Sequence, residues 1–231
     1  MPSEPAPYVH PTQARQKDAW KRLLGEYLTV EPLEVGFTRR LRAQRTQRFL
    51  ELGGGSGPIS RLLAADGIDC VLLDLNVTDW TGHHRPAVIG DLRSIPIRPD
   101  SFDAVAAVNC LYFLADPVAA IRQAYEILRP GGIFLASTPS RDHDPELAGI
   151  PSSHRGTRGT FDAEEAPGLV AQVFEDIEVD RWEAAAYHLP DRAAIVDYLV
   201  AFGVADPEEH AAHLPVPLDI TKKGVDIWAR R

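Results

Sequence analysis

The residues from Phe49 to Ile59 constrain the fold of this chain more than any other stretch. They run FLELGGGSGPI, which is a short apolar segment, a turn with four glycines and the start of a helix. Glycine tolerates a left-handed backbone and lets a ligand approach the main chain closely. Proline suits the first turn of a helix, where its missing N–H has no partner to lose. The stretch therefore predicts a strand, a sharp turn and a helix that place a polar ligand at the carboxyl edge of a sheet.

The spacing within the turn argues against a dinucleotide site. A dinucleotide fingerprint needs a third glycine or alanine three residues after the second one. Pro58 stands at that position, and the glycines follow the pattern Gly-x-Gly-x-Gly. No basic residue is placed to meet a pyrophosphate, and the strand carries Glu51, an acid that suits a ligand with a positive charge. The turn is therefore either a site for another polar ligand or a plain strand-to-helix connection.

Further strands follow at the spacing of repeated strand–helix–strand units. Residues 70–74 and 87–92 are apolar runs that lead to Asp74 and Asp91, and residues 102–109 are almost continuously apolar. Asp74 comes about 20 residues after the glycines, where a carboxylate accepts hydrogen bonds from two adjacent ribose hydroxyls. Asp116 and Pro117 predict the start of the next helix, and residues 132–138 predict a fifth strand.

Together with the string EILRPGGIF at residues 126–134, these motifs resemble the class I S-adenosylmethionine (SAM)-dependent methyltransferases of type 11, a group that includes ubiquinone-pathway enzymes. The resemblance covers residues 46–138 and implies a Rossmann-like, doubly wound α/β fold. Its seven-stranded, mostly parallel sheet would have the order 3-2-1-4-5-7-6, with strand 7 antiparallel. SAM would be the methyl donor and S-adenosylhomocysteine (SAH) the product, with no metal, and Asp91 and Leu92 would lie at the adenine. The cofactor-binding residues so expected are Glu51, Gly53, Gly54, Gly55, Gly57, Asp74, Leu75, Asp91, Leu92 and Asn109.

Composition limits the partners of the chain. The 231 residues carry a formal net charge of −9, which disfavours binding to nucleic acid or to an anionic membrane. No apolar run approaches the length of a membrane span, and no basic-then-apolar leader begins the chain, so we expect a cytoplasmic protein. Cys70 and Cys110 lie in apolar runs and are expected to be inert core residues. We expect a monomer or a homodimer.

The flanking segments predict one domain in three parts. Residues 1–45 would form an N-terminal helical cap, residues 46–138 the SAM-binding core, and residues 139–231 the substrate-side elements and last strands. A helix over 12–28 would either pack on the domain or form a lid. A helix capped by Asp191 is inserted between strands six (174–182) and seven (218–231), where the family commonly has a hairpin. Five arginines between residues 39 and 48 predict a solvated helix face before the first strand.

The expected reaction is methyl transfer to an oxygen or nitrogen atom of a small-molecule acceptor, a metabolite or natural-product intermediate. The reaction would work mainly by positioning, with His143 or His154 as a candidate loop base and Tyr112 in the wall of the acceptor pocket. The string Asn109-Cys110-Leu111-Tyr112 lacks the prolines of exocyclic-amine enzymes and the Pro-Cys of pyrimidine C5 enzymes. The alternatives are an RNA or protein methyltransferase, for which the arginine run is the only signal, and a non-catalytic SAM-binding protein.

Overall fold

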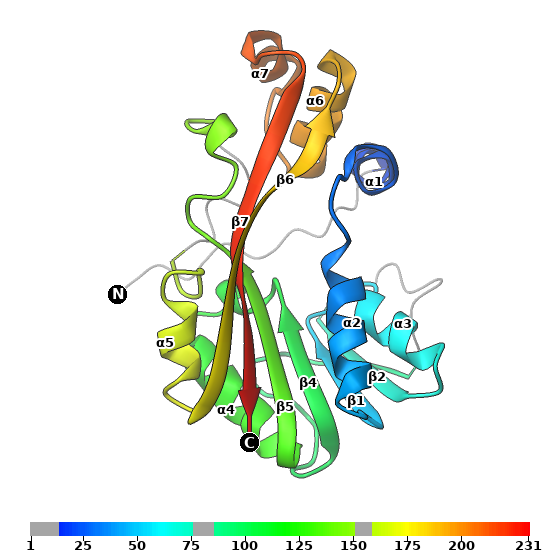
Figure 1. The fold of residues 1–231 in the computed structure, drawn as a ribbon, viewed down its shortest axis with the longest axis vertical. Coiled ribbons are helices and arrows are strands. Elements are labelled where there is room, and N and C mark those ends of the chain that lie inside the picture. Colours follow the sequence, from blue (N-terminus) through cyan, green and yellow to red (C-terminus); the bar gives the residue numbers. More distant parts are fainter. Residues whose placement is uncertain (1–13, 76–85, 151–158) are drawn as a thin grey trace.

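The computed structural model describes residues 14–75, 86–150 and 159–231, and in them the strands form one seven-stranded sheet (Figure 1). The order is β3-β2-β1-β4-β5-β7-β6, as predicted. Strands β1 to β5 run parallel, and β7 is antiparallel to both of its neighbours. The strands are β1 (Arg48–Leu52), β2 (Asp69–Asp74), β3 (Ala87–Ile89), β4 (Phe102–Val108), β5 (Leu128–Pro139), β6 (Asp176–Leu189) and β7 (Leu218–Arg230).

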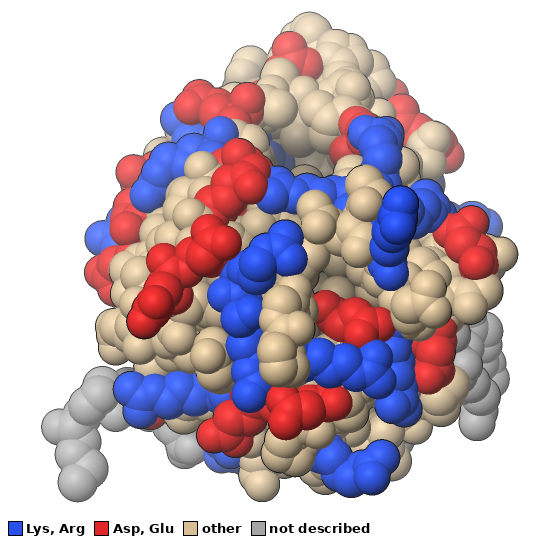
Figure 2. Space-filling view, turned by 60° about the horizontal axis from the view of Figure 1, so that its bottom comes forward, with Lys and Arg blue, Asp and Glu red and all other residues tan. Residues whose placement is uncertain are grey.

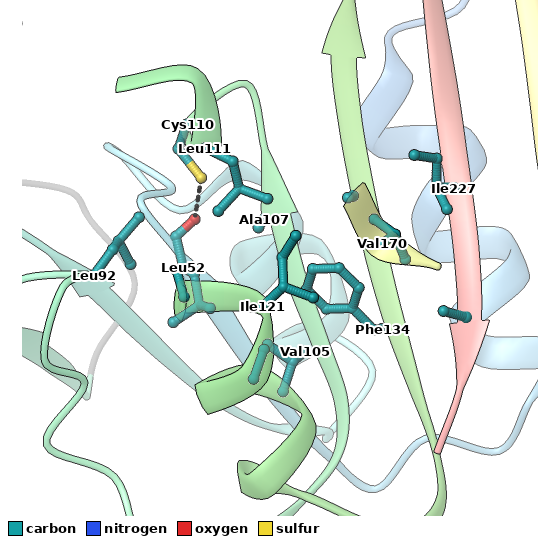
Figure 3. Packing of buried hydrophobic residues seen from close by; sticks show 14 of the residues in the cluster. Leu52, Leu92, Val105, Ala107, Cys110, Leu111, Ile121, Phe134, Val170 and Ile227 are labelled. Atoms are coloured by element: carbon teal, nitrogen blue, oxygen red, sulfur yellow. Dashed lines mark hydrogen bonds between the residues drawn. The ribbon is translucent and has the colours of Figure 1, made fainter. Parts of the chain in front are cut away.

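Helices cover both faces of this sheet because its central strands are apolar on both sides. Helices α2 (Leu33–Ala43) and α3 (Pro58–Ala64) pack on one face, which we call the α2 face. Helices α4 (Pro117–Ile127) and α5 (Ala166–Val170) pack on the other face, the α4 face. Buried residues of the α2 face are Phe37, Leu41, Phe49, Ile59, Leu63, Cys70, Ala104, Ala106, Ile133, Leu135 and Trp228. Those of the α4 face include Val105, Ala107, Ile121, Phe134, Val170 and Ile227 (Figure 3).

The predicted helix starts are confirmed by their caps. Gly57 takes a left-handed conformation before Pro58, which occupies the first turn of α3. The Asp116 carboxylate accepts a hydrogen bond from the Ala119 N–H at 3.1 Å and begins α4. Asp191 caps α6 (Arg192–Ala201) in the same way, with 2.9 Å to the Ala194 N–H. The two aspartates each satisfy an N–H that has no partner within its helix.

Strands β6 and β7 extend beyond the parallel strands, and a second cluster of helices gathers on the extension (Figure 1). It comprises α1 (Ala14–Arg22), the π-helical turn η1 (Leu23–Tyr27), α6 and α7 (Pro207–His213). Helix α1 packs against α6, and the Arg22 guanidinium pairs with the Asp197 carboxylate at 2.5 Å. Leu28 then bridges to Tyr187 on β6, which leads the chain back toward α2. We call this assembly the cap.

The N-terminal helix differs from its prediction over its last turn. The sequence predicts one helical face with Trp20, Leu23, Leu24, Tyr27 and Leu28, but Leu24 is 55% exposed. The chain widens into a π-helix at Leu23, and the wider turn rotates the following side chains away from the 3.6-residue period. Leu23 is therefore fully buried while Leu24 faces outward.

Several other boundaries are corrected by the structure. Strand β5 begins at Leu128 rather than residue 132, and β6 continues to Leu189 rather than ending at residue 182. Strand β3 ends at Ile89, before the predicted end at residue 92. Pro167 lies in the first turn of α5, which begins at Ala166, and α7 was not predicted. The long β6–β7 pairing explains the second correction, because hydrogen bonds to β7 extend β6 into the cap.

The arginine run lies in and after α2, as predicted, and four of its five charges are paired. Arg39 pairs with Glu31, Arg40 with Glu178, Arg42 with Asp66 and Arg48 with Asp69. Figure 2 shows Lys and Arg interspersed with Asp and Glu on the side that carries the amino ends of the parallel strands. Acids therefore pair with most of this run, which argues against a continuous basic surface for RNA.

Candidate functional site

The glycine turn after β1 is closely packed against protein at Gly53 and Gly54 and open at Gly55. Gly53, Gly55 and Gly57 have φ values of +60°, +56° and +71°. A Cβ on Gly53 would lie 2.6 Å from Cys110 Cβ, and one on Gly54 would lie 2.6 Å from Glu51 Cγ. A Cβ on Gly55 would meet nothing within 4 Å. The turn thus needs glycine for its backbone, and it leaves space beside Gly55 that a ligand can fill.

Glu51 supports this turn from behind. Its side chain is almost fully buried, and its Oε2 accepts a hydrogen bond from the Ser60 N–H at 2.8 Å in the first turn of α3. Burial raises the pKa of the Glu51 carboxyl to about 7, although the hydrogen bonds from Ser60 and Ile59 oppose that rise. The structure therefore shows Glu51 fixing α3 behind the glycines. Its predicted role toward a cation on the ligand stays a prediction.

Asp74 lies directly beside the turn, as the spacing predicts. Its Oδ2 accepts a hydrogen bond from the Gly55 N–H at 2.8 Å, which joins the end of β2 to the turn after β1. The next residue, Leu75, is 64% exposed. A carboxylate has room for further donors, so Asp74 can hold the turn and still accept hydroxyl groups of a ligand.

Asp91 follows β3 and is held by its own neighbour. The Arg93 N–H donates to Oδ1 at 2.8 Å, and the guanidinium donates to Oδ2 at 2.7 Å and 2.9 Å. These hydrogen bonds lower the pKa of the Asp91 carboxyl. Leu92 is buried against the turn, with its Cδ1 3.5 Å from the position of a Cβ on Gly53. A ligand group at Asp91 must therefore share the carboxylate with Arg93.

The end of β4 completes the same edge. Asn109 is an exposed residue with φ +53°, and its N–H donates to the Ser137 carbonyl at 2.9 Å. Cys110 then turns into the core, where its Sγ donates to the Leu52 carbonyl at 3.3 Å (Figure 3). Burial raises the pKa of the Cys110 thiol, which fits the inert core role predicted for it. Tyr112 follows in the short helix η2 (Leu111–Phe113), half-buried against Phe113.

His143 is a buried residue and not a surface loop histidine. Its Nδ1 lies 2.8 Å from the Ser140 carbonyl, and its Nε2 lies 3.3 Å from Asp144 Oδ2. Asp144 is itself buried, and the Lys222 Nζ lies 2.7 Å from its Oδ1. Burial by itself raises the pKa of Asp144, but His143 and Lys222 lower it to about 2. The second candidate base, His154, lies outside the described residues.

The predicted cofactor residues follow four neighbouring strands and meet at one edge of the sheet. The turn follows β1, Asp74 ends β2, Asp91 follows β3 and Asn109 follows β4. Within the described ranges, no three side chains of His, Cys, Asp or Glu are grouped to hold a metal ion. None of the described helices has both the length and the apolar composition required to cross a bilayer.

Sequence reasoning missed one polar group on the α2 face. Asp226 on β7 accepts hydrogen bonds from Ser137 on β5 and Trp182 on β6, at 2.7 Å and 3.1 Å. The signal was present in the string GVDIW at residues 224–228, because period-two alternation places Asp226 on the same face as the buried Trp228. A carboxylate on the face that packs against a helix needs a specific explanation.

Comparisons with known proteins agree with this geometry. Residues 50–136 match the family model of a methyltransferase domain. A malonyl-[acyl-carrier protein] O-methyltransferase of Enterobacter lignolyticus is 32% identical over 113 residues, 47% of this chain and 45% of that protein. A demethylmenaquinone methyltransferase of Mycobacterium sp. is 35% identical over 99 residues, 40% of this chain and 43% of that protein. In these matches the chain spans less than half the length of either relative.

A solved structure shares the fold at lower identity. Phosphoethanolamine N-methyltransferase 2 of Haemonchus contortus, in complex with phosphomonomethylethanolamine and SAH, aligns with a TM-score of 0.57 and 16% identity. The alignment covers 85% of this chain and 52% of that one. The matched segment, residues 50–136, and the order of the sheet both agree with the predicted resemblance to class I SAM-dependent methyltransferases. The matched model and the methyltransferase relatives support type 11 within that class, with SAM as the cofactor.

Proposed function

We propose that this chain transfers a methyl group from SAM to an oxygen or nitrogen atom of a small-molecule acceptor. One observation carries the proposal: the glycine turn, Asp74 and Asp91 meet at one edge of the sheet, and Asp74 is hydrogen-bonded to the turn. The two relatives named above have small or carrier-bound acceptors in their names, which supports an acceptor of that kind. The paired charges of the arginine run favour this reading over an RNA substrate.

The residues at this edge suggest how the cofactor would lie. Asp91 and Leu92 would hold the adenine, Asp74 the ribose hydroxyls, and the backbone of residues 53–57 the methionine part. SAM supplies a methyl group that its sulfonium already activates. Following that order from β3 to β1 brings the reactive end toward β4, where Asn109 and Tyr112 lie. The protein would then hold the acceptor in line and exclude water, and positioning of this kind can supply roughly 7–11 kcal/mol.

The cap would provide the acceptor side. Helix α1 and the turn η1 pack against the insert between β6 and β7, and this contact joins the proposed segment 1–45 to segment 139–231. In this arrangement α1 would help to close the site while the 46–138 core binds SAM.

Asp74→Ala is expected to weaken SAM binding by about 1–3 kcal/mol, because ribose hydroxyls would lose their acceptor and the Gly55 N–H its anchor. Asp69→Ala is the matched control, since Asp69 is an exposed acid at the other end of β2. Isothermal titration with SAM measures both variants. Equal affinity in Asp74→Ala and wild type would show that the ribose lies elsewhere.

His143→Gln tests the proposed loop base. Both ring nitrogens face acceptors within the chain, so we expect kcat to change by less than about tenfold and the pH profile of methyl transfer to stay the same. The free energy of unfolding should fall by about 1–3 kcal/mol as Asp144 loses a partner. His188→Gln, at an exposed histidine paired with Asp219, is the control. A loss of roughly 100-fold or more in kcat with an altered pH profile would instead establish His143 as the base.

The function itself is tested by binding first and transfer second. Wild-type protein should bind SAM and SAH in calorimetric titrations and should transfer labelled methyl groups to members of a small-molecule panel. No binding at millimolar-scale SAM would end the proposal. Tight SAM binding with no transfer to any small molecule would favour a non-catalytic SAM-binding protein.

A further inference from the structure

Asp226 lies in a row of side chains that crosses the sheet at the level of the glycine turn. Val108 on β4 pairs with Ser137 on β5, and Ser137 pairs with Asp226 on β7. Leu52, the last residue of β1, pairs with Ala107 of the parallel strand β4. Val108 is the residue after Ala107, so the row is level with Gly53, the residue after Leu52. Because alternate residues of a strand share a face, all three side chains of the row lie on the α2 face.

Two donors fix the Asp226 carboxylate through one oxygen. The Ser137 hydroxyl and the Trp182 indole N–H both donate to Oδ1. Trp182 is held in place over Gly224, where a Cβ would approach its ring to 2.4 Å. In the part of the chain that the structure describes, no group donates to Oδ2, and Asp226 is partly accessible. The carboxylate therefore has a fixed orientation and one oxygen available to a ligand.

The charge of Asp226 is also uncompensated, unlike that of two other acids in this chain, Asp144 and Asp162. The buried Asp144 has Lys222 at 2.7 Å, and the buried Asp162 has Arg141 at 2.7 Å. Across residues 14–75, 86–150 and 159–231, no Lys, Arg or His forms an ion pair with Asp226. Burial raises the pKa of Asp226, and the nearby charge of Asp180 adds to the rise. A cation placed at Oδ2 would relieve both effects.

The distance across the row, from Asp226 to the proposed site of the methyl donor, is one that a small acceptor molecule can span. Neighbouring strands lie about 4.8 Å apart, so Asp226 is roughly 10 Å across the sheet from the end of β4. Ser137 connects the two places, because its carbonyl accepts the Asn109 N–H and its hydroxyl donates to Asp226.

We propose that Asp226, held by Ser137 and Trp182, is a subsite for an ammonium group carried by the methyl acceptor. The inference rests on the proposed function and narrows its substrate class to amine-bearing small molecules. The ammonium would act as an anchor, and the atom that is methylated would lie about 10 Å away, toward β4. Trp182 would lie against the apolar part of the acceptor beside the ammonium.

The test compares two probes that differ only in charge. 2-Phenylethylamine is cationic near neutral pH and 2-phenylethanol is neutral. Binding of each to SAH-saturated wild-type protein is measured by calorimetry. We expect the amine to bind about tenfold more tightly than the alcohol, as a charge-assisted hydrogen bond implies. Equal affinity for the two probes would overturn the proposal.

Asp226→Asn then assigns the preference to this residue. Asparagine keeps an oxygen for Ser137 and Trp182 but removes the charge, so the preference should fall to within about twofold. Asp180→Asn is the matched control, because Asp180 pairs in register with Asp226 and lies exposed on β6, and it should keep the preference. An unchanged preference in folded Asp226→Asn would refute the assignment. Absence of SAH binding in wild type would instead refute the proposed function, which separates the two failures.

Discussion

Gly55→Val is expected to reduce SAM affinity by roughly 100-fold or more, which corresponds to about 3 kcal/mol. The valine side chain would fill the open space beside the turn, where nothing lies within 4 Å of a Cβ and where the methionine part of the cofactor would sit. The backbone at φ +56° also disfavours a β-branched residue, so we expect a stability loss of about 1–2 kcal/mol. The fold should nevertheless survive, because the new side chain meets no protein atom.

Gly67→Val separates the two effects of this substitution. Gly67 has φ +82° and an equally open surrounding, but it precedes β2 at the opposite edge of the sheet. This variant should show a similar loss of stability in thermal unfolding and wild-type affinity for SAH in calorimetry. If Gly55→Val bound SAH as tightly as Gly67→Val does, the cofactor would not lie at the glycine turn.

Glu51→Gln is expected to remove a pH-dependent loss of about 3 kcal/mol from the free energy of unfolding. The pKa of the carboxyl rises from 4.5 to about 7 in the folded chain, and each pH unit of separation corresponds to 1.36 kcal/mol. Because the folded pKa is the higher one, the unfolded state loses its proton first as pH rises. The wild-type free energy of unfolding should therefore fall between about pH 4.5 and pH 7 and level off above.

Glutamine cannot ionise, so its variant should lack this part of the pH dependence. The difference in unfolding free energy between Glu51→Gln and wild type should shift in favour of the variant from about pH 4.5 to about pH 7. Chemical denaturation at several pH values measures it, with Asp69→Asn as a control for removal of an exposed carboxylate. A constant difference across this range would show that Glu51 is not held in a costly charged state.

Local patterns predicted the core of the fold because the signals lay within single segments. The apolar strands, the glycine turn and the caps at Asp116 and Asp191 each depend on a few consecutive residues, and each is confirmed. The order of the sheet followed from the resemblance rather than from the strands themselves. Asp74 was placed beside the turn by its spacing, and the hydrogen bond to the Gly55 N–H agrees with that placement.

The features that escaped prediction depend on contacts between distant segments. The buried His143 contacts Asp144, and Asp144 is paired in turn with Lys222. Lys222 is far away in the sequence, on β7, so this cluster could not be predicted. The π-helical turn follows from packing in the cap, and the spacing of apolar residues in the sequence does not predict it. The hydrogen bonds that orient Asp226 come from donors on β5 and β6. These donors meet the carboxylate only because of the register of the three strands, which the sequence does not reveal. The partner of Asp91, by contrast, is only two residues away and could have been anticipated.

The central claim is that SAM binds over the carboxyl edge formed by the glycine turn, Asp74 and Asp91. A crystal structure of this chain grown with SAH tests that claim most directly. The account predicts the ribose hydroxyls within hydrogen-bond distance of the Asp74 carboxylate and the thioether chain against the backbone of residues 53–57. SAH bound elsewhere, with Asp74 contacting only the protein, would contradict it.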